Sequence, residues 1–277
     1  MPGKVPSKLK NIDYGKSRVR VAKINRHPDR HEFSDLTVDL RLQGSFEQCY
    51  LSGDNSLIVP TDTMKNTVYA IASSVDLDPV EPFALKLAEH FLTTHSHVTA
   101  ATIHVKEHHW SRVDPYTFEQ GQTLRLAKVE MKREGVTIHA GIDKLVLLKT
   151  TKSAFEGYLK DLYTTLPETS DRIFATSVRA LWRYGDPSVD FNGAMERCRH
   201  TLIDVFAAHN SRAVQETLYA MGDAVLQSQN EIAEIRLTLP NKHYLPVNLA
   251  LLGLENRNEI FLPTDEPHGV IEACLTR

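Results

Sequence analysis

The sequence is poor in cysteine and has no run of charges of one sign. Its three cysteines, Cys49, Cys198 and Cys274, are widely spaced and form no C-x-x-C pair, which argues against a disulfide framework and against a thiolate zinc site. The 32 basic and 35 acidic residues give a formal charge of -3, and this balance argues against nucleic acid or an anionic membrane as a partner. We therefore expect a small-molecule ligand.

Long hydrophobic runs and sorting signals are also missing. No apolar segment has the length needed to cross a bilayer, and the basic stretch Met1–Lys10 is not followed by the apolar core of a signal peptide. The last three residues, Leu275-Thr276-Arg277, differ from the S-K-L peroxisomal signal. With 42% hydrophobic and 24% charged residues, the chain is expected to be a soluble, globular, cytoplasmic protein.

The usual cofactor motifs are absent as well. There is no G-x-G, and Gly15-Lys16-Ser17 lacks the earlier glycine of a P-loop because Lys10 stands in its place. The 13 histidines include His95 and His97 but no H-E-x-x-H, since His31-Glu32 has no second histidine. Alternate histidines on a strand are more often partly exposed polar side chains than ligands. We expect no cofactor and no metal site.

Alternation of apolar and polar residues predicts an antiparallel α+β fold. Leu36, Val38, Leu40 and Leu42 alternate with polar residues, and the turn-rich His27–Arg30 separates this strand from Arg18–Ile24, which predicts a hairpin. Further strands are expected within Val98–His104, Thr123–Val129, Val136–Lys149, Ile173–Trp182 and Ile232–Leu239.

Helical spacing of apolar residues occurs in three places, besides a helix expected from Thr61 toward Ala72. The apolar faces are Ala84, Leu87, Ala88 and Phe91; Met195, Cys198, Leu202, Val205 and Phe206; and Val214, Leu218, Met221 and Val225. The order strands, helices, strands therefore occurs twice, which predicts a duplicated α+β unit with a boundary near Glu134-Gly135, that is, units 1–134 and 135–277.

Several segments in a fixed order resemble the urate oxidase family. They are Tyr14-Gly15-Lys16, Val19-Arg20-Val21, Gly53–Tyr69, Ser153–Tyr158, Tyr163–Thr169, Asp171-Arg172-Ile173, Val214–Tyr219, Leu239–Tyr244 and Gly269–Ala273. Each is weakly specific alone, but the whole set covers nearly the full chain and is highly specific. One departure is Pro60, where the family often has a small non-proline residue; Thr61 keeps its own backbone N–H.

The resemblance implies the tunnelling fold (T-fold), in which tandem α+β units with antiparallel sheets, and helices on one face, assemble into a barrel-like homotetramer with active sites between subunits. It implies an enzyme that converts urate, dioxygen and water to 5-hydroxyisourate and hydrogen peroxide without a cofactor. Two alternatives from other classes are a metal-dependent purine or pterin hydrolase of the same fold and a non-catalytic purine-binding homologue.

The same resemblance assigns roles to nine residues. Lys16 and Thr61 match a proton-relay pair, and His243 joins the proton network. The remaining matches hold urate or dioxygen: Asp62 through its backbone, Phe155 by stacking, Arg172 and Gln215 by hydrogen bonds to the ring edges, Val214 beside Gln215, and Asn241 above the ring. An arginine fork and an amide suit a planar, oxygen-rich anion.

Ordinary structural roles remain open for each of these residues. Thr61 or Asp62 is a candidate helix N-cap, and Lys16 a solvated lysine. Arg172 can pair with the adjacent Asp171, Phe155 can belong to the core, and Gln215 can face solvent. Asn241 follows Pro240 as a turn residue does, and a lone histidine such as His243 is usually structural.

Overall fold

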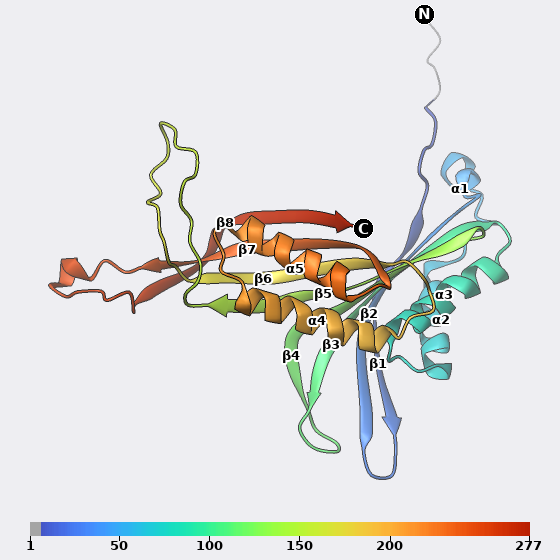
Figure 1. Cartoon of the computed structure of the whole chain (residues 1–277). Helices are drawn as coiled ribbons and strands as arrows, with labels where there is room; N and C mark the ends of the chain where they lie inside the picture. The colour runs from blue at the N-terminus through green and yellow to red at the C-terminus, as the bar shows by residue number, and fades with distance from the viewer. Residues whose placement is uncertain (1–6) are drawn as a thin grey trace, which may run out of the picture. The chain divides into compact units, whose positions relative to one another are not determined.

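The computed structural model describes residues 7–277, and its contacts divide the chain into two compact units (Figure 1). The first unit comprises the chain up to Gly121 together with Arg125–His139, and the second comprises Gln122–Leu124 and Ala140–Arg277. The chain passes between the units within two strands, β4 (Phe118–Lys132) and β5 (Gly135–Lys149). Each unit repeats the predicted order of strands, two long helices and strands.

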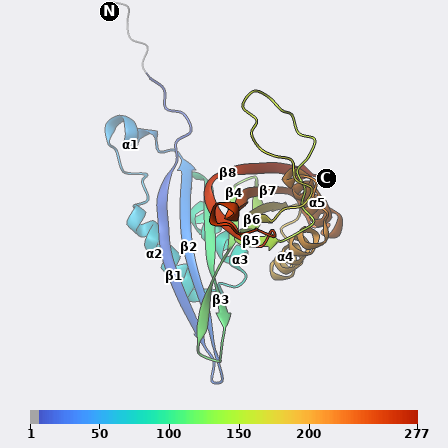
Figure 2. The ribbon, with the colours of Figure 1, turned by 90° about the vertical axis from the view of Figure 1, so that its left-hand side faces the viewer.

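The first unit is built on strands β1 (Tyr14–Arg26), β2 (His31–Gly44), β3 (Val98–Arg112) and β4 (Phe118–Lys132), in that order across the sheet. The predicted hairpin is confirmed, because β1 and β2 pair antiparallel, and β2 pairs antiparallel with β3. A short helix α1 (Glu47–Ser52) precedes α2 (Thr61–Ser74) and α3 (Val80–Thr94). Helix α2 packs on β1 and α3 on β3 (Figure 2).

The core of this unit follows the predicted periodicities. Alternate residues of β2, from Leu36 to Leu42, are fully buried, and so are Ala84, Leu87, Ala88 and Phe91 of α3. The end of β1 next to β2 is unusually tight: a Cβ on Gly15 would lie 1.8 Å from the Leu40 carbonyl oxygen, so only glycine fits there. Beyond Lys16 the register shifts, as in a β-bulge.

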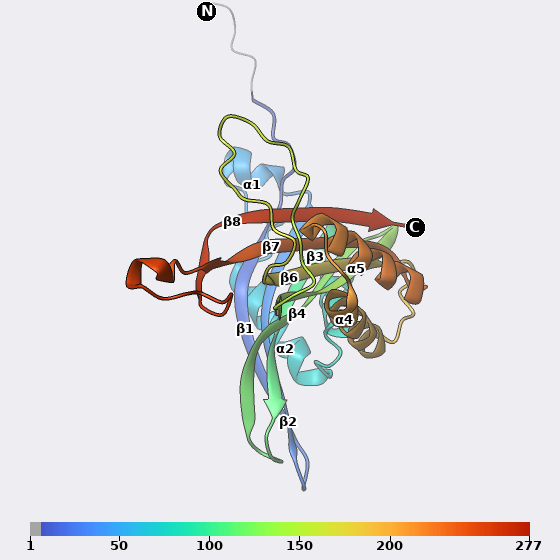
Figure 3. The same cartoon turned by 60° about the vertical axis from the view of Figure 1, so that its left-hand side comes forward.

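The second unit contains β5 (Gly135–Lys149), β6 (Phe174–Tyr184), β7 (Ile232–Pro246) and β8 (Phe261–Thr276), again in chain order. Strand β7 pairs antiparallel with both β6 and β8. Helices α4 (Phe191–Ala208) and α5 (Val214–Ser228) pack on each other, and α5 packs on β7 and β8 (Figure 3). The 3-10 helix η1 (Leu249–Leu252) lies in the connection between β7 and β8.

Both predicted helices of this unit bury the expected faces, with the exception of Val205, which is only partly buried. The α+β class and the antiparallel arrangement are as predicted. None of the described helices combines the length and the apolar character needed to span a membrane.

Candidate active site

The residues singled out in the first unit lie at the start of β1 and the start of α2. Tyr14 joins the two segments: its hydroxyl donates to the Val59 carbonyl at 3.1 Å and accepts from the Val59 N–H at 2.8 Å. The ring of Tyr14 packs edge-on against Phe46, and burial raises the pKa of its hydroxyl. Lys16 follows two residues after this anchor and Thr61 two residues after Val59, so the anchor fixes the segments that carry both.

Thr61 and Asp62 are the first two residues of α2, and neither is its N-cap. Pro60 holds that position and offers no side-chain hydrogen bond, so the N-cap alternative is wrong. The exposed Thr61 hydroxyl has no hydrogen-bond partner among residues 7–277 and can exchange a proton with a ligand. Asp62 accepts from Lys65 Nζ at 2.5 Å and from Asn66 at 3.0 Å; Lys65, with a smaller contribution from Lys16, holds its pKa below the usual value.

In the second unit, the segment between β5 and β6 carries Phe155 and Arg172. Backbone hydrogen bonds pair Phe155 with Thr169 at 2.8 and 3.1 Å, and Arg172 N–H donates to the Ser153 carbonyl at 2.7 Å. The same stretch is bonded to the loop before α5, because Ala154 N–H donates to Ser211 O at 2.7 Å. These backbone hydrogen bonds connect Phe155 and Arg172 to the loop before α5 and so fix their positions relative to the start of that helix.

The Arg172 guanidinium is partly buried and lies over the Phe155 ring, 5.2 Å from its centroid. The ion pair with Asp171 does not form; Asp171 instead accepts from the Thr151 hydroxyl at 2.7 Å, which lowers its pKa. Arg172 Nε is buried and has no hydrogen-bond partner within the described part of the chain, and burial lowers the pKa of the guanidinium. A buried donor left unpaired costs about 1–3 kcal/mol, which an anionic ligand would offset.

Phe155 is not a core residue, since its side chain is only partly buried. Its ring is stacked with Tyr158, with centroids 4.7 Å apart and an interplanar angle of 13°. A flat ligand stacking on Phe155 would therefore compete with Tyr158 or Arg172 for the ring faces. Tyr158 belongs to the quoted Ser153–Tyr158 segment, but nothing in the sequence pattern indicated this contact.

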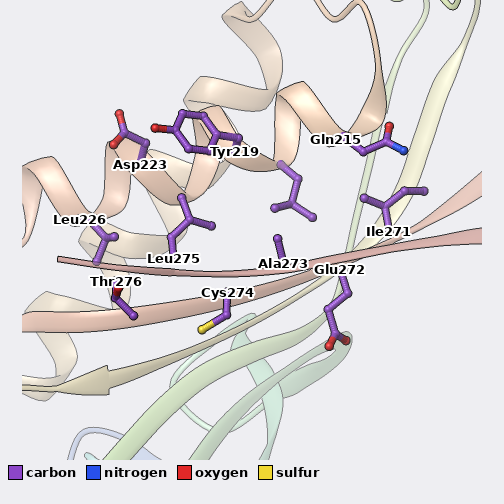
Figure 4. Close-up of a pocket in the computed structure, with 11 residues that line it drawn as sticks. Gln215, Tyr219, Asp223, Leu226, Ile271, Glu272, Ala273, Cys274, Leu275 and Thr276 are labelled. Carbon is purple, nitrogen blue, oxygen red and sulfur yellow. The ribbon is translucent and has the colours of Figure 1, made fainter. Parts of the chain in front are cut away.

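Val214 and Gln215 are the first two residues of α5. Val214 is buried, whereas Gln215 is exposed and lies at one end of a groove between α5 and β8 with a volume of about 510 Å³ (Figure 4). The groove floor is formed by Ala273 and Leu275 of β8. Beside Gln215, Glu216 accepts from the backbone and side chain of Arg212, which lowers the Glu216 pKa to about 2.

Asn241 and His243 lie within β7, so the turn alternative for Asn241 is wrong. The register of β7 with β8 shifts between these two residues, placing Asn241 opposite Gly269 and His243 opposite Thr264. On the other side Asn241 pairs with Thr176 of β6, a fully buried residue whose hydroxyl has no hydrogen-bond partner among the residues that the structure describes. Thr176 is not predicted from the sequence, since a lone threonine in a strand carries no signal.

The structure thus places Lys16, Thr61 and Asp62 in the first unit and the other six residues in the second. Within residues 7–277, no group of three or more histidine, cysteine, aspartate or glutamate side chains is placed to hold a metal ion. The sites offer hydrogen-bond donors, an arginine, an aromatic ring and a lysine. Such a set suits a planar anion and proton transfer.

Comparison with known proteins identifies the family. A family model described as Uricase matches residues 12–135 and 138–272. Uricase from Arthrobacter globiformis is 42% identical over 267 residues, covering 95% of this chain and 88% of that protein. Uricase from Dictyostelium discoideum is 38% identical over 274 residues, with 95% and 96% covered.

Solved structures agree in fold. The crystal structure of Arthrobacter globiformis uricase superposes with a TM-score of 0.95 at 41% identity, covering 99% of this chain and 96% of that one. A urate oxidase from Bacillus sp. TB-90 matches at TM-score 0.85 and 22% identity, over 97% and 100% of the two chains, and shows the fold alone. The α+β T-fold expected from the resemblance is confirmed, and the chain belongs to the uricase family.

Proposed function

We propose that this chain oxidises urate with dioxygen and water to 5-hydroxyisourate and hydrogen peroxide, without a cofactor. The proposal rests on membership of the uricase family and on one structural observation: Arg172 presents a partly buried guanidinium with an unpaired Nε next to Phe155. In the same unit the backbone bonds of Ser153 and Ala154 connect that guanidinium to the start of α5 and Gln215.

Urate is held by side chains of the second unit. Arg172 donates to adjacent acceptors on one edge of the anion, Gln215 offers an amide donor and acceptor to another, and Phe155 contacts the ring face. Val214 packs beside Gln215, and Asn241 holds dioxygen or water above the ring. Asp62 contributes its backbone N–H at the start of α2, where unpaired helix N–H groups favour an anion.

Lys16, Thr61 and His243 move protons. Lys16 takes a proton from urate through the Thr61 hydroxyl, which leaves an electron-rich dianion, and His243 extends the network to water. The dianion transfers two electrons to dioxygen by way of a hydroperoxide on the ring. Loss of hydrogen peroxide leaves an oxidised purine, and water adds to it to give 5-hydroxyisourate. The protein contributes orientation and stabilisation of charge.

The assembly is a homotetramer with active sites between subunits, in which Lys16, Thr61 and Asp62 of one chain meet the second-unit residues of a neighbour. Exposed apolar side chains support association: Leu159 is 93% exposed, Leu162 89% and Leu251 84%. We further propose that the T-fold units are residues 1–134 and 135–277 and that the enzyme works in the cytoplasm, with no nucleic-acid or membrane partner.

The first experiment follows the near-ultraviolet absorbance of urate and the uptake of dioxygen in one vessel, with metal-free protein. Equal consumption of both, unchanged by a chelator, is the expected result. Loss of activity with chelator and recovery with zinc would favour the metal-dependent hydrolase, and urate binding without consumption would favour a binding homologue. The comparisons give no support to either alternative.

A further inference from the structure

The two units repeat with one constant sequence offset from the end of the first long helix (α2 or α4) through the second long helix and the third strand. Helices α3 and α5 begin at Val80 and Val214 and end at Thr94 and Ser228, and β3 and β7 are displaced by the same amount. A lysine clamp is repeated too. Lys23 donates to the Ala72 and Val75 carbonyls at the end of α2, and Lys149 to the Phe206 and His209 carbonyls at the end of α4. The units can therefore be compared residue by residue here.

At this offset, two residues of the proposed urate site have carboxylate counterparts in the first unit. Gln215, the second residue of α5, corresponds to Glu81, the second residue of α3. Asn241 of β7 corresponds to Glu107 of β3. Neutral amides that suit an anion are thus replaced by groups that suit a cation.

A guanidinium from the chain itself occupies the first-unit position. Arg125 of β4 donates to Glu81 at 2.8 Å and lies 3.7 Å from Asp78 Oδ1. The pair is enclosed, since the Glu81 side chain is 0% exposed and that of Arg125 13%. The second carboxylate oxygen of Glu81 is buried and has no hydrogen-bond partner in residues 7–277, so the site retains acceptor capacity that Arg125 does not fill.

Glu107 completes the cluster. Burial raises its pKa to about 7, the nearby Arg125 charge opposes this, and Asp78 and Glu81 add to it. Glu107 and Asp78 also line a cavity of about 970 Å³ beside Trp110, so this side of the cluster borders an open space. Carboxylates with acceptor capacity therefore surround a guanidinium at the counterpart of a ligand site.

We propose that the first unit contains a second, charge-inverted ligand site at Glu81 and Glu107, specific for a guanidinium group, and that Arg125 is its built-in occupant. This proposal rests on the proposed function in one respect only, namely that Gln215 and Asn241, with which Glu81 and Glu107 are compared, belong to the urate site. Because its carboxylates repel an anion, this site binds no urate, and each chain supplies one set of urate-binding residues.

The test removes the Arg125 guanidinium and supplies a free guanidinium ion in its place. Arg125→Ala leaves the buried Glu81 carboxylate without its guanidinium and should lower the thermal midpoint by on the order of 10 °C. Millimolar methylguanidinium chloride should restore part of this loss, while tetramethylammonium chloride at equal concentration should not. The wild-type protein should show no such preference, because Arg125 already fills the site. The Glu81→Gln/Arg125→Ala double variant should show none either, because its site lacks the Glu81 carboxylate.

Equal responses of Arg125→Ala to the two salts, or an equal methylguanidinium effect in the double variant, would overturn the proposal. If Arg125→Ala does not fold unaided, recovery of folded protein on dilution from urea gives the same comparison, and recovery that does not depend on methylguanidinium overturns it as well. Because the test measures unfolding and not activity, failure of the guanidinium-site proposal would say nothing against the urate reaction. Likewise, absence of urate oxidation would not change the outcome of the unfolding test.

Discussion

Lys16 is the residue on which the proposed proton transfer depends most directly. Its side chain is partly buried near the start of β1, next to the Tyr14 anchor and close enough to Asp62 to affect that carboxylate's pKa. Lys16→Met removes the base but keeps the length of the side chain. We expect kcat for urate to fall by about 10²-fold or more while urate affinity changes little.

Lys86→Met is the matched control for Lys16→Met, because Lys86 is an exposed lysine of α3 outside the proposed site. It should retain wild-type kcat and KM. Steady-state kinetics with a separate measurement of urate binding distinguish the possibilities. If affinity falls as much as kcat, Lys16 binds urate and the relay role is contradicted.

Glu107 predicts a pH dependence of stability. The carboxyl titrates near 4.5 in the unfolded chain and near 7 in the folded protein. Between these pH values only the folded protein holds the proton. The contribution of Glu107 to the free energy of unfolding is therefore complete below pH 4.5 and is lost as the pH rises to 7. The shift corresponds to about 3 kcal/mol. The groups that face Glu107 are Arg125, Asp78 and Glu81.

Urea unfolding of wild type and Glu107→Gln between pH 5 and 7.5 tests this prediction. The wild type should lose more stability than Glu107→Gln over this range, and Glu119→Gln, at an exposed position of β4, should behave as the wild type. Parallel pH profiles for wild type and Glu107→Gln would show that Glu107 does not titrate in this window.

The two lysine clamps, Lys149 at the end of α4 and Lys23 at the end of α2, predict different effects on urate affinity. Lys149 holds the end of α4, and the loop that follows leads to Gln215, with His209 Nδ1 and Thr217 Oγ1 3.1 Å apart across it. Lys23 holds the end of α2, and the loop after it leads to Glu81, outside the urate site. Burial lowers the pKa of Lys149, and its ammonium lies over the Phe206 ring.

Lys149→Met and Lys23→Met should each cost about 1 kcal/mol of folding free energy, because each removes hydrogen bonds to the carbonyls at the end of a helix. Only Lys149→Met should raise KM for urate, since only that loop positions Gln215. Lys149→Arg should restore part of the affinity. A similar KM change in both methionine variants would mean that general destabilisation, and not positioning, is responsible.

The elements show how far the sequence predicts this fold. Strands β2 and β7 and helices α3 and α5 follow directly from their apolar periodicity, because each buries one face. Helix α1 was missed since its six residues include none that is buried. Strand β8 was missed because it contains Pro263 and Pro267 and most of its residues are exposed.

The site was predictable only through family resemblance. Single residues such as Arg172 and Gln215 have no periodic signal, and their roles depend on contacts across the chain. The pairing of Arg125 with Glu81 and the buried hydroxyl of Thr176 come from packing between strands and helices that are distant in sequence. Local patterns do not contain this information.

The proposed site residues divide between the two units of each chain, and we propose that each active site lies between neighbouring chains. Lys16→Met damages a first-unit contribution, and Arg172→Met damages a second-unit contribution. Each variant alone should be nearly inactive. An oligomer mixed from both variants, however, contains sites where an intact Lys16 from one chain meets an intact Arg172 from the other.

Random mixing of equal amounts should restore about a quarter of wild-type activity, because a site is intact only when both of its chains are the correct variant, each with a chance of about one half. The two proteins would be dissociated in mild urea, mixed, returned to buffer and assayed for urate loss, with each variant treated alone as control. If every site used one chain only, no mixture could contain an intact site. Activity no higher than that of the separate variants, with mixed oligomers verified by differential tags, would therefore contradict shared sites.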